Sequence, residues 1–188
     1  MSQPSFSHRM ARWRVPLGFL AAIVYFVLAR PAVQSIGIGA AVALVGVGWR
    51  AWASGMIRKD AALARDGPYG LSRNPLYFGS FLIAVGFAWA GHRAALFVGI
   101  VLFFLAIYWP VMRREEEHLE ALFGDTFTAY AREVPLFLPW KGSSRRGKEK
   151  VPFTWRQYWR NREYNVLLGF CSAVALLFPR PKTSPITK

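Results

Sequence analysis

The stretch 76-LYFGSFLIAVGFAWAGHRAALFVGIVLFFLAIYWPVM-112 decides the fold class. Its apolar residues form two blocks, 76–90 and 94–112, separated only by Gly91-His92-Arg93. Neither block shows the polar stripe of an amphipathic helix on a soluble protein. A helix needs about 17–25 apolar residues to cross a bilayer, so the second block qualifies, and the first nearly does with interfacial aromatics at its ends. We therefore expect a hairpin of two membrane helices here.

Three further apolar blocks lie at 15–29, 36–53 and 166–178. The block 36–53 is long enough to span, and 15–29 is short but flanked by arginines and a tryptophan that suit the interface. The last block also fits a re-entrant or interfacial segment, so its crossing stays open. The sequence predicts an all-α polytopic membrane protein of about five hydrophobic helices, forming a single domain over residues 1–188.

Basic residues set the expected orientation. The chain has 24 Lys and Arg against 10 acidic residues, for a net charge of +14. Such an excess is typical either of nucleic-acid binding or of the positive-inside rule for membrane proteins. The basic residues gather before the first block, in 54–75 and in 141–162, whereas the two short links between spans hold one each. We expect an integral membrane protein with the N-terminus and the regions 54–75 and 113–163 in the cytoplasm, and no nucleic-acid partner.

The segment 141–163 is expected to be a basic cytoplasmic linker. Eight basic residues stand in 141–162 against Glu149. Near an anionic leaflet each would contribute roughly 1 kcal/mol, so anionic lipid headgroups are the expected partner of this segment. A solvated linker that only fixes topology is the alternative.

Small residues recur inside the second block, at Gly37, Gly39, Ala43, Gly46 and Gly48. No strand precedes them, so a dinucleotide-binding loop is excluded, and close helix packing in lipid is the better interpretation. Arg50 follows them near the expected cytoplasmic end of this span. Because an arginine at mid-membrane costs roughly 2.5–3.5 kcal/mol, we expect Arg50 to reach the headgroups.

Metal and disulfide chemistry are not expected. Cys171 is the single cysteine, and the three histidines are not at metal-ligand spacing.

Six of the ten acidic residues fall within residues 115–133. Glu115 and Glu116 stand at the exit of the fourth block, where ionised groups are costly unless paired. The helix is expected to continue to Phe123 and stop at Gly124. A short amphipathic helix over 125–133 and an extended apolar segment over 134–140 should follow.

Two motifs flank the hairpin. Gly67-Pro68-Tyr69 and Arg73-Asn74-Pro75-Leu76-Tyr77-Phe78-Gly79 precede it, and Glu115-Glu116, Leu119, Phe123-Gly124, Tyr130 and Val134-Pro135 follow it. In order and spacing, residues 45–140 resemble the isoprenylcysteine carboxyl methyltransferase and phospholipid methyltransferase superfamily of integral membrane enzymes. Asn74 stands where many members have histidine, so a titrating group near neutral pH is lost there. Leu136 stands where an arginine is usual, which leaves one cationic contact in doubt.

The resemblance implies that S-adenosylmethionine binds between the two motifs. Arg73 would hold its carboxylate, Glu115 and Glu116 its ammonium and hydroxyl groups, and aromatic faces its sulfonium. Arg73 and Glu116 are the expected catalytic residues. The expected cofactor-binding residues are Gly67, Pro68, Tyr69, Arg73, Asn74, Pro75, Tyr77, Gly79, Glu115 and Glu116.

By the same resemblance, the acceptor is a lipophilic small molecule or lipid-linked substrate, either an isoprenylcysteine-type carboxylate or a thiol. A carboxylate acceptor would need a second cation to bind it, for which Arg50, Arg156 and Arg162 are candidates. Three alternatives remain: a phospholipid N-methyltransferase, an NADPH-dependent enzyme like the sterol reductases, which share an Arg-His-Pro-x-Tyr signature, and a non-enzymatic membrane scaffold.

Overall fold

A computed structural model describes residues 6–58, 62–140 and 152–178 of the chain, and within these ranges it contains helices and no strands. The α-helices are α1 (Phe6–Leu28), α2 (Val33–Met56), α3 (Pro75–Ala90), α4 (Ala94–Phe123), α5 (Asp125–Glu133), α6 (Trp155–Arg160) and α7 (Tyr164–Leu177), and a 3₁₀ turn, η1, covers Gly67–Gly70. The predicted all-α class is confirmed.

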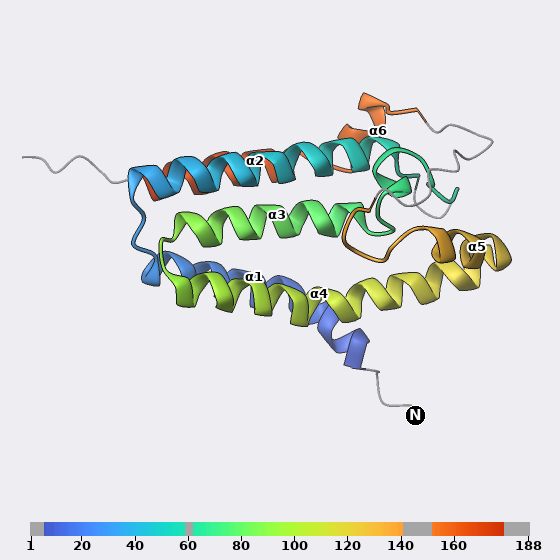
Figure 1. The fold of residues 1–188 in the computed structure, drawn as a ribbon, viewed down its shortest axis with the longest axis horizontal. Helices are drawn as coiled ribbons and strands as arrows, with labels where there is room; N and C mark the ends of the chain where they lie inside the picture. The colour runs from blue at the N-terminus through green and yellow to red at the C-terminus, as the bar shows by residue number, and fades with distance from the viewer. Residues whose placement is uncertain (1–5, 59–61, 141–151, 179–188) are drawn as a thin grey trace, which may run out of the picture.

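The apolar helices run along the long axis of the molecule (Figure 1). Helices α2 and α4 are long and apolar enough to cross a membrane, and Pro16–Leu28, α3 and α7 are apolar but shorter. Helices of 24 and 30 residues measure about 36 and 45 Å, against a hydrocarbon core of about 30 Å. Large apolar side chains of these helices are exposed, among them Phe19, Val45, Leu102 and Leu176, as expected for a surface that faces lipid.

The elements η1, α5 and α6 gather at one end of the bundle, which we call the site end (Figure 1). Helices α1, α3 and α7 run away from the site end, and α2 and α4 run toward it. The loop between α2 and α3 and the chain after α4 therefore lie at the same end, as the charge pattern predicts.

Helix α4 is continuous from the apolar block to Phe123, as predicted. Gly124, with a φ of +53°, ends it, and α5 begins at the next residue. Glycine adopts such a left-handed conformation without the strain that a Cβ would add. This turn directs α5 back beside the end of α4.

The segment expected as a linker is partly folded. Residues 155–160 form α6, which packs on α2, and the backbone N–H of Thr154 donates to the carbonyl of Gly55 at 3.0 Å. Phe153 lies so close to Gly55 that a side chain there would overlap its ring. The other part of the expected linker, 141–151, lies outside the described residues.

Helix α7 lies along much of α2. It begins one residue after Glu163, which pairs with Arg50 at the site end, and near its other end Leu177 packs in one cluster with Ile36, Tyr25 and Ala90. The last apolar block is thus a full member of the bundle.

Helices α2 and α3 form the tightest pair. A Cβ on Gly39 would overlap the carbonyl oxygen of Gly86, and a Cβ on Gly46 would overlap that of Gly79. Gly37 and Gly48 face open space instead. The small residues that hold the helices together therefore follow one stripe, at positions 39, 43 and 46, and Arg50 is the next residue on that stripe.

Candidate active site

The two predicted motifs meet at the site end. The backbone N–H of Arg73 donates to Pro135 O at 2.9 Å, and that of Trp140 donates to Leu71 O at 3.1 Å. The hydroxyl of Ser72, which is fully buried, donates to Phe137 O at 2.8 Å. The chain after α5 is thereby fastened to the loop that begins α3.

Asn74 and Leu136, the two departures from the family pattern, contact each other. The side-chain amide of Asn74 donates to Leu136 O at 3.1 Å, and Ser72 Oγ accepts from the Asn74 backbone N–H at 3.2 Å. Asn74 is buried immediately before the first residue of α3. It therefore helps to hold the two motifs together with a bond that does not depend on protonation near neutral pH.

Tyr69 and Tyr130 form the second link. The Tyr130 hydroxyl donates to Tyr69 O at 2.7 Å, and the Arg65 guanidinium lies 5.5 Å from the centre of the Tyr130 ring. Tyr130 packs with Phe127 and Val134 in a cluster that also includes Leu63. Both tyrosines are buried, and burial raises the pKa of each phenol above its ordinary value of 10.0, so both are neutral donors over the physiological range.

Arg73 and Glu116 form an ion pair between the loop and α4. Arg73 Nη1 lies 2.6 Å from Glu116 Oε1, and Arg113 Nη1 donates to Glu116 Oε2 at 3.0 Å. The short contact is not aligned as a hydrogen bond, so within the described chain Glu116 Oε1 has no hydrogen-bond donor. Arg73 Nε is also buried there without an acceptor. The Arg113 side chain is 58% exposed, whereas Arg73 and Glu116 are 15% and 10% exposed, so Arg73–Glu116 is the inner pair.

Arg50 forms a second ion pair, with Glu163. Nε donates to Oε1 at 2.5 Å, and Nη2 donates to Oε2 at 3.2 Å. Nη1 donates to Leu76 O at 3.1 Å and to Ser80 Oγ at 2.5 Å. The expectation that Arg50 reaches the headgroups is wrong, because the guanidinium is held against the first turn of α3.

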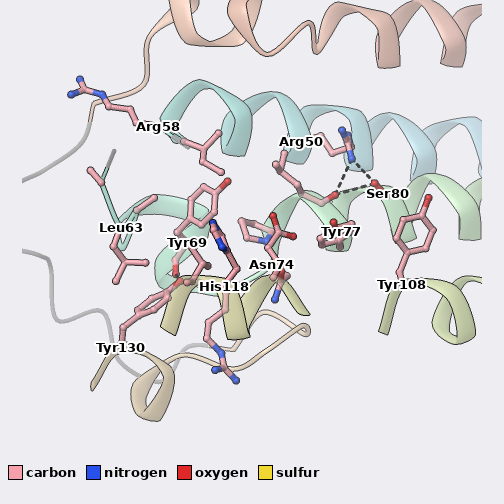
Figure 2. Close-up of a pocket in the computed structure, with 18 of the residues that line it drawn as sticks. Arg50, Arg58, Leu63, Tyr69, Asn74, Tyr77, Ser80, Tyr108, His118 and Tyr130 are labelled. Carbon is pink, nitrogen blue, oxygen red and sulfur yellow. Dashed lines mark hydrogen bonds between the residues drawn. The ribbon is translucent and has the colours of Figure 1, made fainter. Parts of the chain in front are cut away.

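A cavity of about 760 Å³ is lined by the arginines of both ion pairs, Arg50 and Arg73, and Figure 2 shows its residues. Tyr69, Tyr130 and Arg58 lie toward one end of it, and Arg50, Ser80 and Tyr108 toward the other. We call these the outer and inner ends. The cavity is also lined by Phe19 and Ala22 of α1, by Ala62, Leu63 and Ala64 before η1, and by Glu115, His118 and Leu119 of α4. This volume lies within the usual range for small-molecule sites.

The predicted site residues divide into two groups. Six line the cavity, namely Tyr69, Arg73, Asn74, Pro75, Tyr77 and Glu115. Gly67, Pro68, Gly79 and Glu116 do not line it. Gly67, at a φ of +59°, shapes the turn beside Met56, and Gly79 makes room for Arg50 Cγ, so both glycines serve packing within the protein.

Sequence reasoning missed Ser80, Tyr108 and Arg58 as lining residues. Ser80 lies one helical turn after Tyr77 on α3, so it could have been predicted to share the face of α3 on which Tyr77 lies. Tyr108 stands inside an apolar run and gives no comparable signal. In the described ranges, no three His, Cys, Asp or Glu side chains come close enough to hold a metal ion.

Comparison with known proteins identifies the family. The phospholipid methyltransferase family model matches residues 13–126, which include α2, α3, all of α4 and every residue that lines the cavity except Tyr130. The chain belongs to the phospholipid methyltransferase family. Membership and the apolar helices together make it an integral membrane protein of a methyltransferase family. No solved structure matches it.

Three curated relatives of this family member bear on its activity. A cobalt-zinc-cadmium resistance protein, CzcN, from Cupriavidus metallidurans is 34% identical over 70% of this chain and 64% of its own length. A nickel-cobalt-cadmium resistance protein, NccN, from Alcaligenes xylosoxydans is 32% identical over 70% of this chain and 65% of its own. The protein-S-isoprenylcysteine O-methyltransferase of Schizosaccharomyces pombe is 34% identical over 43% of this chain and 34% of its own length. The chain thus spans just under two thirds of the two resistance proteins.

Proposed function

We propose that this protein is an S-adenosylmethionine-dependent methyltransferase that works at the cytoplasmic face of the membrane. Its acceptor is a lipophilic molecule that carries an isoprenylcysteine-type carboxylate or a thiol. The observation that carries the proposal is the cavity at the site end, where the two family motifs meet around unpartnered buried polar atoms. The described basic residues of the loop between α2 and α3 and of α6 lie at the same end, which supports the cytoplasmic orientation.

The outer end of the cavity suits the methyl donor. The Tyr69 hydroxyl and Arg73 Nε are buried there without hydrogen-bond partners in the described chain. An unpaired buried polar atom costs about 1–3 kcal/mol, so a ligand that satisfies both atoms gains that energy. Arg73 would bind the donor's carboxylate, and Glu115, which is exposed at the cavity wall, would accept from its ammonium.

Glu116 acts through Arg73 in this proposal. It lies outside the cavity lining, and its carboxylate holds the Arg73 guanidinium. We therefore treat Glu116 as a positioning residue.

The inner end suits the acceptor. It is bounded by Tyr77, Ser80 and Tyr108 (Figure 2), and the cavity is also lined by Phe19 on α1, a helix with exposed apolar side chains. When bound, the donor supplies an electrophilic methyl group: the acceptor's lone pair forms the new bond to carbon, and the electron pair of the broken S–CH₃ bond returns to sulfur. The side chains of the cavity hold the two reactants in line and exclude water, which together supply much of the rate.

A phospholipid amine is the second candidate acceptor, favoured by the description of the family model. An ammonium head would have to lose a proton before methylation, and Glu115 is the carboxylate on the cavity wall that suits this step. Activity with phosphatidylethanolamine vesicles and none with farnesylcysteine or a long-chain thiol would select this candidate.

The test is calorimetric titration of detergent-purified protein with S-adenosylmethionine and, separately, with NADPH. We expect the methyl donor to bind and NADPH not to. The variants Arg73→Ala and Tyr69→Phe should lose about tenfold or more in donor affinity, because each removes a partner of a charged or buried group. Arg132→Ala, on the exposed side of α5, is the matched control and should bind as the wild type does. Binding of NADPH alone would point to a reductase, and binding of neither would favour a non-enzymatic scaffold.

A further inference from the structure

Arg50 is the cation at the inner end of the cavity. It continues the stripe of small residues on α2, and Gly79 opposite leaves the space that its side chain fills, since a Cβ there would overlap Arg50 Cγ. Its side chain is 19% exposed, and Figure 2 shows it beside Ser80, on the Tyr108 side of the cavity. An acceptor carboxylate that entered this end would meet Arg50 first.

The charge of Arg50 is already neutralised. Glu163, whose side chain is 7% exposed, takes two of its N–H groups, and Leu76 O and Ser80 Oγ take two more. Four of the five guanidinium donors are therefore engaged within the protein. A carboxylate that reached Arg50 would meet a charge already compensated by Glu163, and displacing Glu163 would leave a buried charge without a partner.

The other candidate cations are placed elsewhere. Arg156 and Arg162 are exposed and do not line the cavity. Arg58 is exposed and extends away at the outer end, and Arg73, whose Nε has no acceptor in the described chain, is the cation that the proposed function assigns to the donor's carboxylate. Among the residues that the structure describes, the inner end presents hydroxyl groups and apolar side chains but no uncompensated positive charge.

Building on the proposed function, we propose that Glu163 determines acceptor specificity. By neutralising Arg50, it makes the inner end accept an uncharged head group, such as a thiol, and reject a carboxylate. A carboxylate that moved there would lose its hydration without gaining a cation, a cost of several kcal/mol. On methylation of a thiol, a lone pair of its sulfur forms the bond to the methyl carbon, the electron pair of the broken S–CH₃ bond returns to the donor's sulfur, and the thiol proton passes to bulk water.

Glu163 lies beyond the family match of 13–126, so this specificity belongs to the segment that follows the common domain. That segment is held firmly: Asn161 Nδ2 donates to Ser54 O at 2.8 Å, and Arg162 takes a left-handed φ of +53° directly before Glu163. These contacts fix Glu163 beside α2 and support a defined role for its carboxylate.

The test compares two probes that differ only in charge at one end: a fluorescent long-chain fatty acid and the matching alcohol. Both are titrated into detergent-purified wild type, Glu163→Gln, Glu163→Asp and the double variant Arg50→Gln/Glu163→Gln. This measurement needs neither methyl donor nor turnover, so its outcome is independent of whether the protein is a methyltransferase. Size-exclusion profiles and thermal unfolding report whether each variant folds.

We expect the wild type to prefer the alcohol. Glu163→Gln should bind the acid about 10- to 100-fold more tightly, because a freed guanidinium gains a charge-assisted hydrogen bond, and should bind the alcohol as before. Glu163→Asp should retain the preference for the alcohol. The double variant removes both charges and should also prefer the alcohol, and this result can be measured even if Glu163→Gln does not fold. An unchanged acid-to-alcohol ratio in Glu163→Gln, an equal loss of both probes, or a double variant that prefers the acid would overturn the proposal.

Discussion

The guanidinium of Arg73 lies 2.6 Å from the carboxylate of Glu116, and this pair joins the loop before α3 to the last third of the continuous helix α4. It connects the two halves of the family pattern, which the membrane hairpin separates in sequence. The predictions below concern this pair, the tyrosines beside it and the helix packing that brings them together.

Glu116→Gln should weaken methyl-donor binding while the protein remains folded. The amide keeps the shape of the carboxylate but leaves Arg73 without its counter-charge and free to change rotamer. We expect about a tenfold loss of affinity, measured by calorimetry, because a displaced Arg73 would weaken its hydrogen bonds to the donor's carboxylate, and hydrogen bonds to charged groups contribute about 1.5–3 kcal/mol. Arg113→Gln removes the other, exposed partner of Glu116 and should change affinity less than about threefold. Equal losses in the two variants would contradict a specific role for the inner pair.

Tyr130→Phe and Tyr25→Phe form a matched pair. Each removes a 2.7 Å hydrogen bond from a tyrosine hydroxyl to a backbone carbonyl, of Tyr69 at the site and of Phe87 elsewhere in the bundle. Tyr130→Phe should lower the free energy of unfolding by about 1–3 kcal/mol, because the buried Tyr69 O is left unpaired, and Tyr25→Phe by about 0.5–1.5 kcal/mol, because Phe87 O still accepts from the Gly91 N–H. Only Tyr130→Phe should also weaken donor binding, because Tyr69 lines the cavity and Tyr25 does not. A loss of binding in Tyr25→Phe would mean that general destabilisation explains both.

Gly46→Ala should be strongly destabilising, and Gly48→Ala should not. A methyl group on Gly46 would overlap Gly79 O, whereas one on Gly48 would enter open space. We expect Gly46→Ala to cost about 1–3 kcal/mol, and Gly48→Ala to be neutral or slightly stabilising in a helix interior. Thermal unfolding in one detergent measures both. Similar melting temperatures for the two variants would show that the α2–α3 contact is looser than the structure has it.

Stability should fall at high pH because of Tyr69 and Tyr130. Burial raises the pKa of both phenols in the folded protein. Below pH 10 both are neutral whether the chain is folded or not, and they add no pH dependence. Above pH 10 the unfolded chain loses these protons while the folded chain keeps them, so the free energy of unfolding falls by up to about 1.4 kcal/mol per pH unit for each tyrosine. Thermal unfolding between pH 8 and 11 should show a shallower decline for Tyr69→Phe, and an identical decline would contradict this origin.

Sequence patterns alone determined much of this protein. The apolar blocks located the membrane helices to within a few residues, except that α1 begins well before residue 15. Gly124 marked the end of α4, and the two motifs marked two segments whose residues line the cavity. These features are local: helix length, capping and motif spacing depend on neighbouring residues in the chain.

The pairing of charges at the site was decided by the tertiary structure. The sequence predicted that Arg50 reaches the headgroups because no partner for it was visible. Its partner, Glu163, stands in a basic stretch whose composition predicted a linker. The pairing of Glu116 with Arg73 could not be predicted, because no sequence pattern shows which side of α4 faces the loop before α3. Ion pairs between distant segments depend on how helices pack and rotate against each other, and here the stripe of small residues sets that packing. Charges that hydropathy assigns to the membrane surface are instead buried against each other around the cavity, because in a low dielectric each is stable only with its partner.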